Sequence, residues 1–170
     1  MRAYAILGTV CFLLIAPGVV AGWIPWWLSR WRMHLPLLGF SPIRIVGVLL
    51  IAVGIPLVLE SFARFALKGL GTPAPILPTR HLVISGLYRY VRNPMYIGVS
   101  SVIFGQFLLL GDVNLFWYGV LVAIGFHIFV LAYEEPTLRR TFGEEYEVFC
   151  ANVPRWIPRL SAWRGVTSSL

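Results

Sequence analysis

The sequence predicts an all-α integral membrane protein with about four transmembrane helices and a C-terminal amphipathic helix on the cytoplasmic side. Of the 170 residues, 58% are hydrophobic and only 12% are charged. A water-soluble domain carries about 25% charged residues, so most of the surface of this chain is not suited to water. The length fits one domain, and no linker, repeat or low-complexity block divides it.

Four apolar runs approach or reach the length of about 20 residues that a helix needs to cross a bilayer. They are residues 4–28, residues 43–59 with an amphipathic extension to residue 67, residues 95–110 and residues 113–133. The first run also resembles a signal peptide, because Arg2 precedes an apolar stretch that ends in small residues. That run continues through Leu28, well beyond such a cleavage site, and so favours a retained helix that is kinked at Pro17.

The positive charges predict the orientation in the membrane. The net charge of +7 does not indicate a nucleic-acid partner, because the cations are few and lie in loops between apolar runs. Cations gather in the loop of residues 64–92 and in the tail, as Arg64, Lys68, Arg80, Arg89, Arg92, Arg139, Arg140, Arg155, Arg159 and Arg164. Both regions are expected in the cytoplasm, and four crossings then place both termini there. The first loop, with Arg30, Arg32 and Arg44, would face outward, against this rule.

The chain is interpreted as a single membrane domain over residues 1–170. Its expected parts are a two-helix scaffold (1–67), a cytoplasmic loop (68–94), a helical hairpin (95–133) and a cytoplasmic tail (134–170), with the chemistry in about 80–158. The tail has an apolar stripe at helical spacing, formed by Phe142, Tyr146, Phe149, Cys150 and Val153. Pro154 is expected to end this helix.

Ionisable groups close to membrane depth are costly, so each is a candidate for function. Glu134 and Glu135 close the fourth apolar run, and His127 shares a helix face with Glu134. Structural roles remain alternatives, since the glutamates can form the hydrated end of a helix and His127 can bond within the bundle.

Polar and small residues mark one face of the third run. Gln106 is expected to bond a neighbouring helix. Gly98, Ser101 and Gly105 form a small-residue face, which either permits close helix packing or leaves room for a ligand.

A helix start and the glutamate pair are expected to meet. Pro94 suits the first turn of the third helix, where free backbone N–H groups can hold a carboxylate. A tight turn at Gly111 brings that helix start to the same membrane face as the glutamates, and the tail helix can close over both. This arrangement predicts a pocket for a zwitterionic, partly cationic ligand, open sideways to lipid. The cysteines and histidines lack metal-ligand spacing, so no metal is expected.

Several short motifs resemble those of one enzyme group. Residues 86–98 follow the pattern G-x-Y-x-x-x-R-[HN]-P-x-Y-x-G, and the Glu134-Glu135 pair comes about 40 residues later. An F-G-x-x-Y segment at residues 142–146 and a V-P step at residues 153–154 follow. Over residues 72–158 the chain therefore resembles the membrane-embedded methyltransferases that include isoprenylcysteine carboxyl methyltransferases and phospholipid methyltransferases.

The resemblance implies S-adenosyl-L-methionine as cofactor and a membrane lipid or other lipophilic molecule as methyl acceptor, without metal or nucleic acid. The acceptor could be an isoprenylcysteine-like carboxylate, a phospholipid amine or a small hydrophobic molecule. A non-catalytic membrane scaffold or a small transporter with the same fold is the alternative. The resemblance to these methyltransferases also implies a set of cofactor-site candidates. They are Arg92, Asn93, Pro94, Tyr96, Gly98, Glu134 and Glu135, with Tyr88 and Tyr146 as weaker ones.

Among these, Glu135, Arg92 and Tyr96 are the catalytic candidates, and the substrate candidates are Arg139, Arg140 and His127. The chain departs from the isoprenylcysteine enzymes, which tend to carry an arginine where this chain has Asn152. They also have arginines shortly before the glutamate pair, where residues 131–133 are uncharged. The missing cations weaken the case for a carboxylate acceptor, although Arg139, Arg140 or Arg155 could substitute for them.

Overall fold

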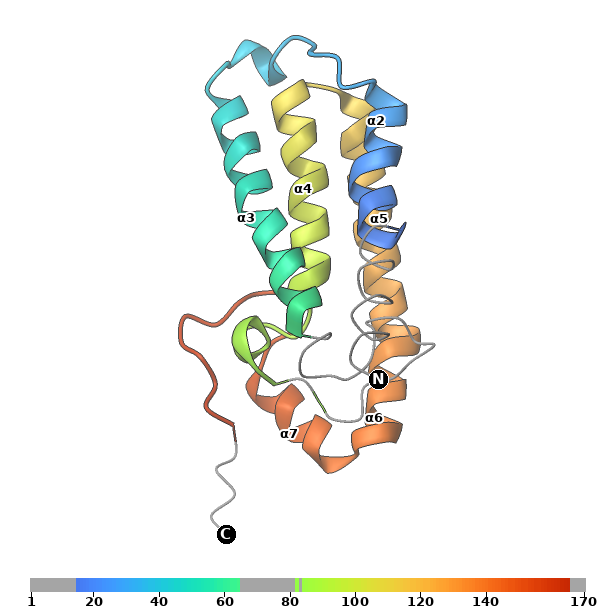
Figure 1. Cartoon of the computed structure of the whole chain (residues 1–170), viewed down its shortest axis with the longest axis vertical. Coiled ribbons are helices and arrows are strands. Elements are labelled where there is room, and N and C mark those ends of the chain that lie inside the picture. Colours follow the sequence, from blue (N-terminus) through green and yellow to red (C-terminus); the bar gives the residue numbers. More distant parts are fainter. Residues whose placement is uncertain (1–14, 65–81, 83, 166–170) are drawn as a thin grey trace.

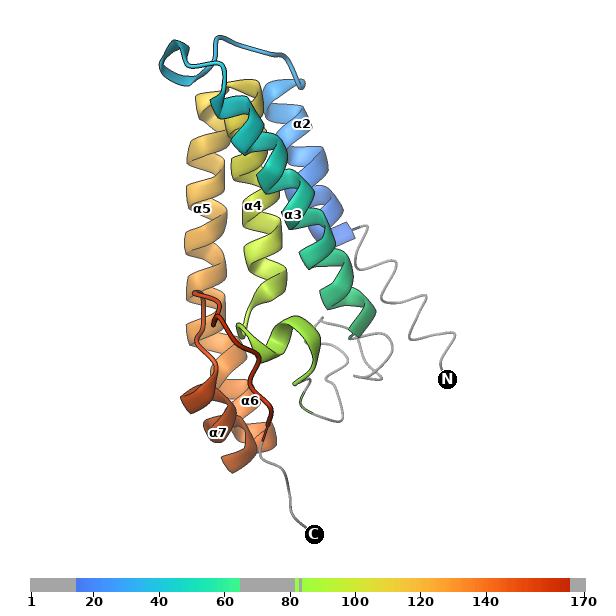
Figure 2. The ribbon, with the colours of Figure 1, turned by 90° about the vertical axis from the view of Figure 1, so that its left-hand side faces the viewer.

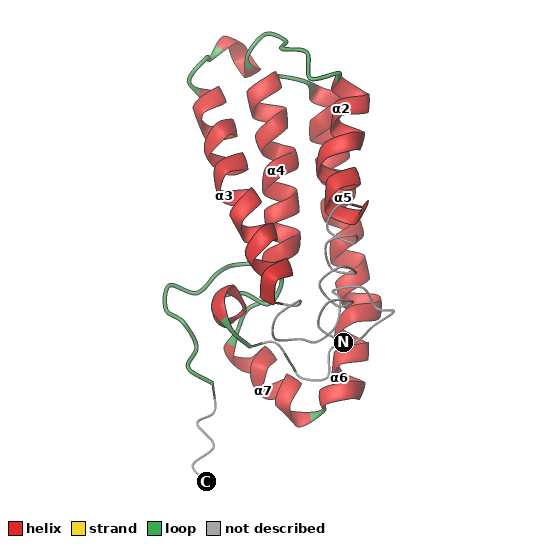
Figure 3. Cartoon of the chain, viewed as in Figure 1, coloured by secondary structure: helices red, strands yellow, loops and turns green. Residues whose placement is uncertain are grey.

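The computed structural model describes residues 15–64, 82 and 84–165, and within these residues it contains helices and loops but no strand (Figure 3). The elements in chain order are η1 (Val19–Trp23), α2 (Ile24–Ser29), η2 (Leu37–Gly39), α3 (Ile43–Arg64), η4 (Gly86–Arg89), α4 (Pro94–Leu110), α5 (Val113–Phe129), η5 (Val130–Glu134), α6 (Glu135–Phe142) and α7 (Glu144–Asn152). The prediction of an all-α fold is confirmed for the described residues. Residues 4–14 of the first apolar run and most of the 64–92 loop lie outside them.

Three long helices run side by side, with α4 between α3 and α5 and with η1 and α2 against α4 and α5 (Figures 1 and 2). Two helical runs, Ile43–Arg64 and Val113–Phe142, are long and apolar enough to cross a membrane. Helix α4 is equally apolar but has 17 residues. Large apolar side chains such as Trp117 and Leu121 point outward from α5 and are mostly exposed. This outward apolar surface is typical of helices that contact lipid.

Helices α3 and α4 pack backbone against backbone. A Cβ atom added at Gly54 would lie 2.7 Å from the carbonyl oxygen of Gly98, and one at Gly105 would lie 2.7 Å from that of Gly47. Such distances are too short for any side chain, so glycine is required for this approach. The small-residue face of α4 therefore serves close packing, the first of the two alternatives. The assignment of Gly98 to cofactor binding stays a prediction.

Both π-helical turns in the described part of the chain end two residues before a proline. In η1 the N–H of Ile24 donates to the carbonyl of Val19, and Pro25 follows. In η5 the N–H of Glu135 donates to the carbonyl of Val130, and Pro136 follows. A proline inside a helix lacks its own N–H and clashes with the carbonyl four residues earlier, and a wider turn relieves that clash. The kink expected at Pro17 stays a prediction, because the apolar run before Ile15 lies outside the described residues.

The tight hairpin between the last two long helices is confirmed. Helix α4 ends at Gly111, which adopts a left-handed conformation, and the Asp112 carboxylate accepts a hydrogen bond from the N–H of Asn114 to cap α5. Gln106 bonds a neighbouring helix as expected, since its amide donates to the carbonyl of Ala21 (2.7 Å) and accepts from the indole of Trp31 (3.1 Å).

The tail helix is divided by Gly143. Helix α6 continues the line of α5 and ends at Phe142, and α7 then turns back beneath the bundle (Figure 1). Tyr146, Phe149 and Val153 are buried on one side of α7, which confirms the apolar stripe for these three residues. The stripe was expected to form one helix from Phe142 onward, and the positive φ of Gly143 interrupts it. Helix α7 ends just before Pro154, as predicted.

The glycine contact between α3 and α4 can be tested with single methyl groups. Gly54→Ala should lower the free energy of unfolding by about 1–3 kcal/mol, because the new Cβ meets the backbone of α4. Gly125→Ala on α5 is the matched control, since its Cβ meets nothing within 4 Å, and it should be neutral or stabilising by about 0.5–1 kcal/mol. Thermal unfolding of both variants in detergent measures the difference. Equal unfolding temperatures would contradict the packing argument.

Candidate functional site

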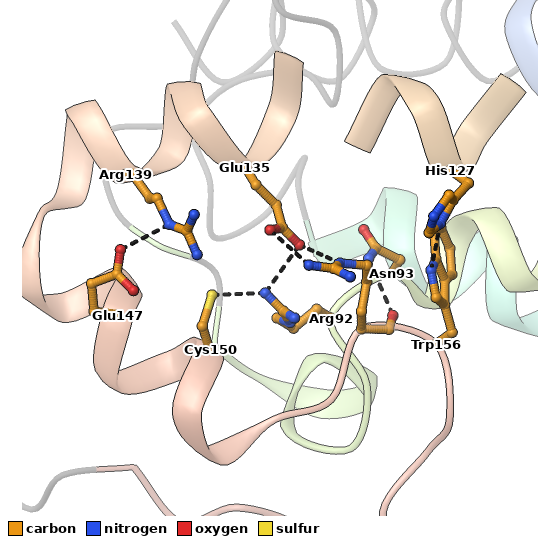
Figure 4. A network of polar contacts seen from close by, with 9 residues as sticks. Arg92, Asn93, His127, Glu135, Arg139, Glu147, Cys150 and Trp156 are labelled. Carbon is orange, nitrogen blue, oxygen red and sulfur yellow. Dashed lines mark hydrogen bonds and ion pairs between the residues drawn. The ribbon is translucent and has the colours of Figure 1, made fainter. Parts of the chain in front are cut away.

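A charged cluster lies at the end of the bundle where α4 begins and where α5 passes into α6 (Figure 4). Four segments supply its members: the residues that precede α4, the η5–α6 junction, helix α7, and the tail after it. The cluster is defined here as Arg92, Asn93, Glu134, Glu135, Cys150 and Arg155 together with Tyr96. Six of these seven were sequence candidates or stripe residues, and the chain brings them together across about 60 positions.

Glu135 is the centre of the cluster. Its side chain is only 5% exposed, and both carboxylate oxygens are bound by Arg155, with Nε 2.6 Å from Oε1 and Nη2 3.0 Å from Oε2. Arg92 Nη1 donates to the same Oε1 at 3.1 Å. A buried carboxylate is tolerated when charged donors surround it in this bidentate way. The guanidinium of Arg155 has its pKa raised by the hydrogen bond to Glu135, so it remains a cation.

Arg92 is held on several sides but keeps one donor free. Besides Glu135, its Nη1 contacts the Cys150 sulfur at 2.7 Å, and its backbone N–H donates to the carbonyl of Pro154 at 2.9 Å. Its Nε atom is buried and has no hydrogen-bond partner among the described residues. A buried donor without a partner is costly, and it points to a missing acceptor.

The tail after α7 docks along the segment before α4. The side-chain amide of Asn93 donates to the carbonyl of Arg155 (3.1 Å), and the N–H of Arg159 donates to the carbonyl of Tyr90 (2.9 Å). Further along, the N–H of Trp163 donates to the carbonyl of Arg89, whose side chain donates back to the carbonyl of Trp163. These backbone bonds hold the tail over the cluster and explain how Arg155 reaches Glu135.

Tyr96 links the cluster to the inside of the bundle. Its hydroxyl donates to Glu134 Oε2 at 2.9 Å, and its ring packs on Phe126 with centroids 4.6 Å apart. Tyr96 and Phe126 also line a cavity of about 400 Å³, whose wall is made of Leu50, Ile97, Ser100, Ser101, Phe104, Ala123, His127 and Trp156. The wall is mainly apolar and comes from α3, α4, α5 and the tail, so the cavity joins the outer surface of the bundle to the charged cluster.

His127 and Trp156 both line this cavity, and their rings lie next to each other (Figure 4). The indole N–H of Trp156 donates to His127 Nδ1 at 3.1 Å. A neutral imidazole that accepts at Nδ1 carries its proton on Nε2. His127 therefore presents a hydrogen-bond donor with its remaining nitrogen, which suits it to hold an acceptor oxygen better than to remove a proton.

The other candidate residues are distributed around the cluster. Pro94 is fully buried in the first turn of α4. Tyr88 and Tyr146 are both buried, and burial raises the pKa of each phenol, so both stay protonated at neutral pH. Arg139 is exposed and pairs with Glu147.

One substrate candidate, Arg140, is exposed and is not part of the cluster. Two other residues of the site region were not expected from the sequence. Trp156 and Phe126 were missed, because neither belongs to a motif. The one signal for Trp156 was its place directly after the V-P step and Arg155.

The buried ion pair can be compared with an exposed one of the same chemistry. Glu135→Gln leaves two guanidinium groups without their anion and should cost about 3 kcal/mol or more of unfolding free energy. Glu147→Gln removes the partner of Arg139 in a pair whose side chains are 48% and 55% exposed, and should cost less than about 1 kcal/mol. Thermal unfolding and limited proteolysis of the tail report the two effects. Similar losses in both variants would show that Glu135 does not hold the tail.

A family model described as phospholipid methyltransferase matches residues 43–145, which is more than half of the chain. The match begins at the first residue of α3 and includes the residues before α4, the α4–α5 hairpin and the Glu134-Glu135 pair. Comparisons with curated proteins and with solved structures give no match. The resemblance drawn from the short motifs is confirmed by this independent match, and the chain belongs to the phospholipid methyltransferase family.

Proposed function

We propose that this protein transfers a methyl group from S-adenosyl-L-methionine to a lipophilic acceptor at the cytoplasmic face of a membrane, and that its helices form a bundle of about four membrane crossings. The observation that carries this proposal is the position of Tyr96. Its hydroxyl bonds Glu134 in the charged cluster, and its ring lines the apolar cavity. A polar cofactor from the cytoplasm and an apolar acceptor from the bilayer would therefore meet at one side chain.

The residues of the cluster suit the cofactor. S-adenosyl-L-methionine carries a carboxylate, an amino group and a positively charged sulfonium. The buried Nε of Arg92 lacks an acceptor, and the carboxylate of the cofactor would supply one. Glu134 and Glu135 would receive the amino group or the ribose hydroxyls. The aromatic rings of Tyr96 and Phe126 would pack against the adenine or stabilise the sulfonium through cation–π contact.

Methyl transfer is an in-line displacement, so the residues of the site have to align the two reactants and exclude water. The bound cofactor supplies an electrophilic methyl group on sulfur. Tyr96 and Phe126 would form the wall against which the methyl group and the acceptor meet. Trp156 and the docked tail would keep water out of that meeting point.

Glu134, which is bonded to the cavity residue Tyr96, favours an amine as the acceptor. Glu134 lies behind Tyr96 and would attract a lipid amine, whereas it would repel a carboxylate. An ammonium group must lose a proton before its nitrogen can form the new bond to carbon. Glu134 would accept that proton, and the electron pair of the broken carbon–sulfur bond would stay on sulfur. Among the acceptors considered, a phospholipid amine therefore fits this cavity best.

The positive charges support a cytoplasmic position for the cluster and both termini. Eight arginines of the described residues lie at the cluster end or in the tail: Arg64, Arg89, Arg92, Arg139, Arg140, Arg155, Arg159 and Arg164. Cytoplasmic loops carry such an excess of cations.

Cofactor binding separates this proposal from a non-catalytic scaffold or transporter. Titration calorimetry of the purified protein should show saturable binding of S-adenosyl-L-methionine, and Arg92→Ala should weaken it on the order of tenfold or more, as the loss of one charge-assisted hydrogen bond predicts. Wild-type protein that folds but shows no saturable binding would favour the scaffold or transporter.

Methyl transfer itself can be followed in membranes that contain phosphatidylethanolamine and radiolabelled cofactor. We expect the label in the lipid fraction. Tyr96→Phe removes one hydroxyl and should lower kcat on the order of tenfold, the value of one positioning hydrogen bond. Tyr133→Phe is the matched control, because Tyr133 is exposed and close by in sequence. Label in the protein fraction alone, or equal rates in both variants, would contradict the proposal.

The acceptor cavity can be filled from α5. Ala123→Leu places a larger apolar side chain in the cavity wall. It should raise KM for the lipid several-fold and leave cofactor affinity unchanged. The reason is that the new side chain takes the space of one or two methylene groups of the lipid, and each contact of this kind contributes about 1–3 kcal/mol. Ala52→Leu on the exposed face of α3 is the control. A lipid KM that stays at the wild-type value in Ala123→Leu would exclude this cavity as the acceptor site.

A further inference from the structure

The loop that joins α2 to α3 forms the end of the bundle opposite the charged cluster (Figures 1 and 2). Several bonds tie it to the helices. The N–H of His34 donates to the carbonyl of Leu110 (2.8 Å), and the guanidinium of Arg44 donates to the carbonyl of His34 (2.7 Å). The indole of Trp31 bonds Gln106. The loop is therefore a fixed surface with a defined shape.

Its outward side is apolar. Leu35 is 87% exposed and Phe40 60% exposed, and Trp31 and Met33 are more than half exposed. Exposed apolar groups at the end of a membrane bundle become stable when they enter the boundary between lipid headgroups and acyl chains. Tryptophan is typical of this depth.

The same loop carries three arginines that form no ion pair with an acidic side chain among the residues that the structure describes. Arg30 and Arg32 are exposed, and Arg30 lies over the Trp26 ring at 4.8 Å. The Nε atom of Arg44 is buried and has no hydrogen-bond partner among the described residues.

Most acidic residues of the chain lie at the other end of the bundle. The chain has seven of them, and six lie toward the cluster end: Glu60, Glu134, Glu135, Glu144, Glu145 and Glu147. The seventh, Asp112, is buried and its carboxylate caps α5. Within the described part of the chain, the positive charge of the loop is therefore not paired with an acidic side chain.

We propose that this loop face, formed by Trp31, Met33, Leu35 and Phe40 with Arg30, Arg32 and Arg44, binds the headgroups of anionic phospholipids in the leaflet opposite the charged cluster. The negatively charged lipid headgroup supplies an anion for these arginines, and the apolar side chains enter the lipid beside it. Such a surface also explains why three arginines lie on the outer side of the membrane, where the positive-inside rule predicts few cations. The proposal does not depend on methyl transfer.

The test uses full-length protein in liposomes and the fluorescence of its own tryptophans. Four of the seven lie in residues 23–31, so the signal reports chiefly on this end. Quenching by dibrominated phosphatidylglycerol is compared with quenching by dibrominated phosphatidylcholine, and the ratio gives the relative binding constant. Wild-type protein should prefer the anionic lipid, and the preference should fall as salt is raised.

The variant Arg30→Asn with Arg32→Gln should lower the preference about fivefold or more, because each cation near an anionic surface contributes about that much. Asparagine is chosen since residue 30 has a positive φ, and Arg32→Gln alone serves if the double variant does not fold. Arg140→Gln with Arg164→Gln removes two exposed cations at the other end and should leave the preference unchanged. Equal quenching by both lipids in the wild type, or an equal loss in the control, would overturn the proposal.

Discussion

The carboxylate of Glu135 is the contact on which the arrangement of the site depends. It joins Arg92, which stands just before α4, to Arg155, which lies in the tail, and it comes itself from the start of α6. Two guanidinium groups offset the cost of burying one negative charge. The backbone of each arginine is also held, since the N–H of Arg92 donates to the carbonyl of Pro154 and the carbonyl of Arg155 accepts from the side-chain amide of Asn93. Without this anion, two like charges would face each other in a poorly solvated space, and the tail would lose its anchor.

The helix geometry around Glu135 follows from the residue beside it. Pro136 cannot donate a backbone hydrogen bond, and the helix widens into the η5 turn, which ends two residues before it. Adjacent residues of a helix point in different directions, and Glu134 bonds Tyr96 whereas Glu135 bonds the two arginines. Adjacent glutamates thus have separate environments, one at the cavity and one at the tail.

The packing of α4 divides the bundle into a tight side and an open side. Paired glycines bring α4 onto α3 until backbone atoms touch. Toward α5 the contacts are made by larger residues such as Tyr96, Phe104 and Phe126, and the cavity lies among them. The paired glycines therefore fix the position of α4, and the cavity lies beside this contact, where Leu50 of α3 and Ser101 of α4 also line it.

Much of the fold was predictable from local patterns. The starts of α3 and α5, the end of α4 at residue 110, the hairpin at Gly111 and the end of α7 agree with expectations from hydrophobic runs, proline and glycine. Patterns of this kind depend on residues that are close together in the sequence. Arg92, Tyr96 and the two glutamates were chosen as candidates from such local patterns as well. The break at Gly143 and the two π-turns were missed, because a wide turn differs from an α-helix by one residue and leaves no periodic signal.

The sequence by itself determined the apolar helices, the membrane environment, the family and the polar residues from which a site could be built. Only the tertiary structure decided that Gly98 faces α3, that Arg155 reaches Glu135 and that Trp156 bonds His127. The physical reason is distance along the chain. Hydrophobic periodicity and turn chemistry act over a few residues, whereas these contacts join residues between 20 and 44 positions apart and form only when the helices and the tail are packed.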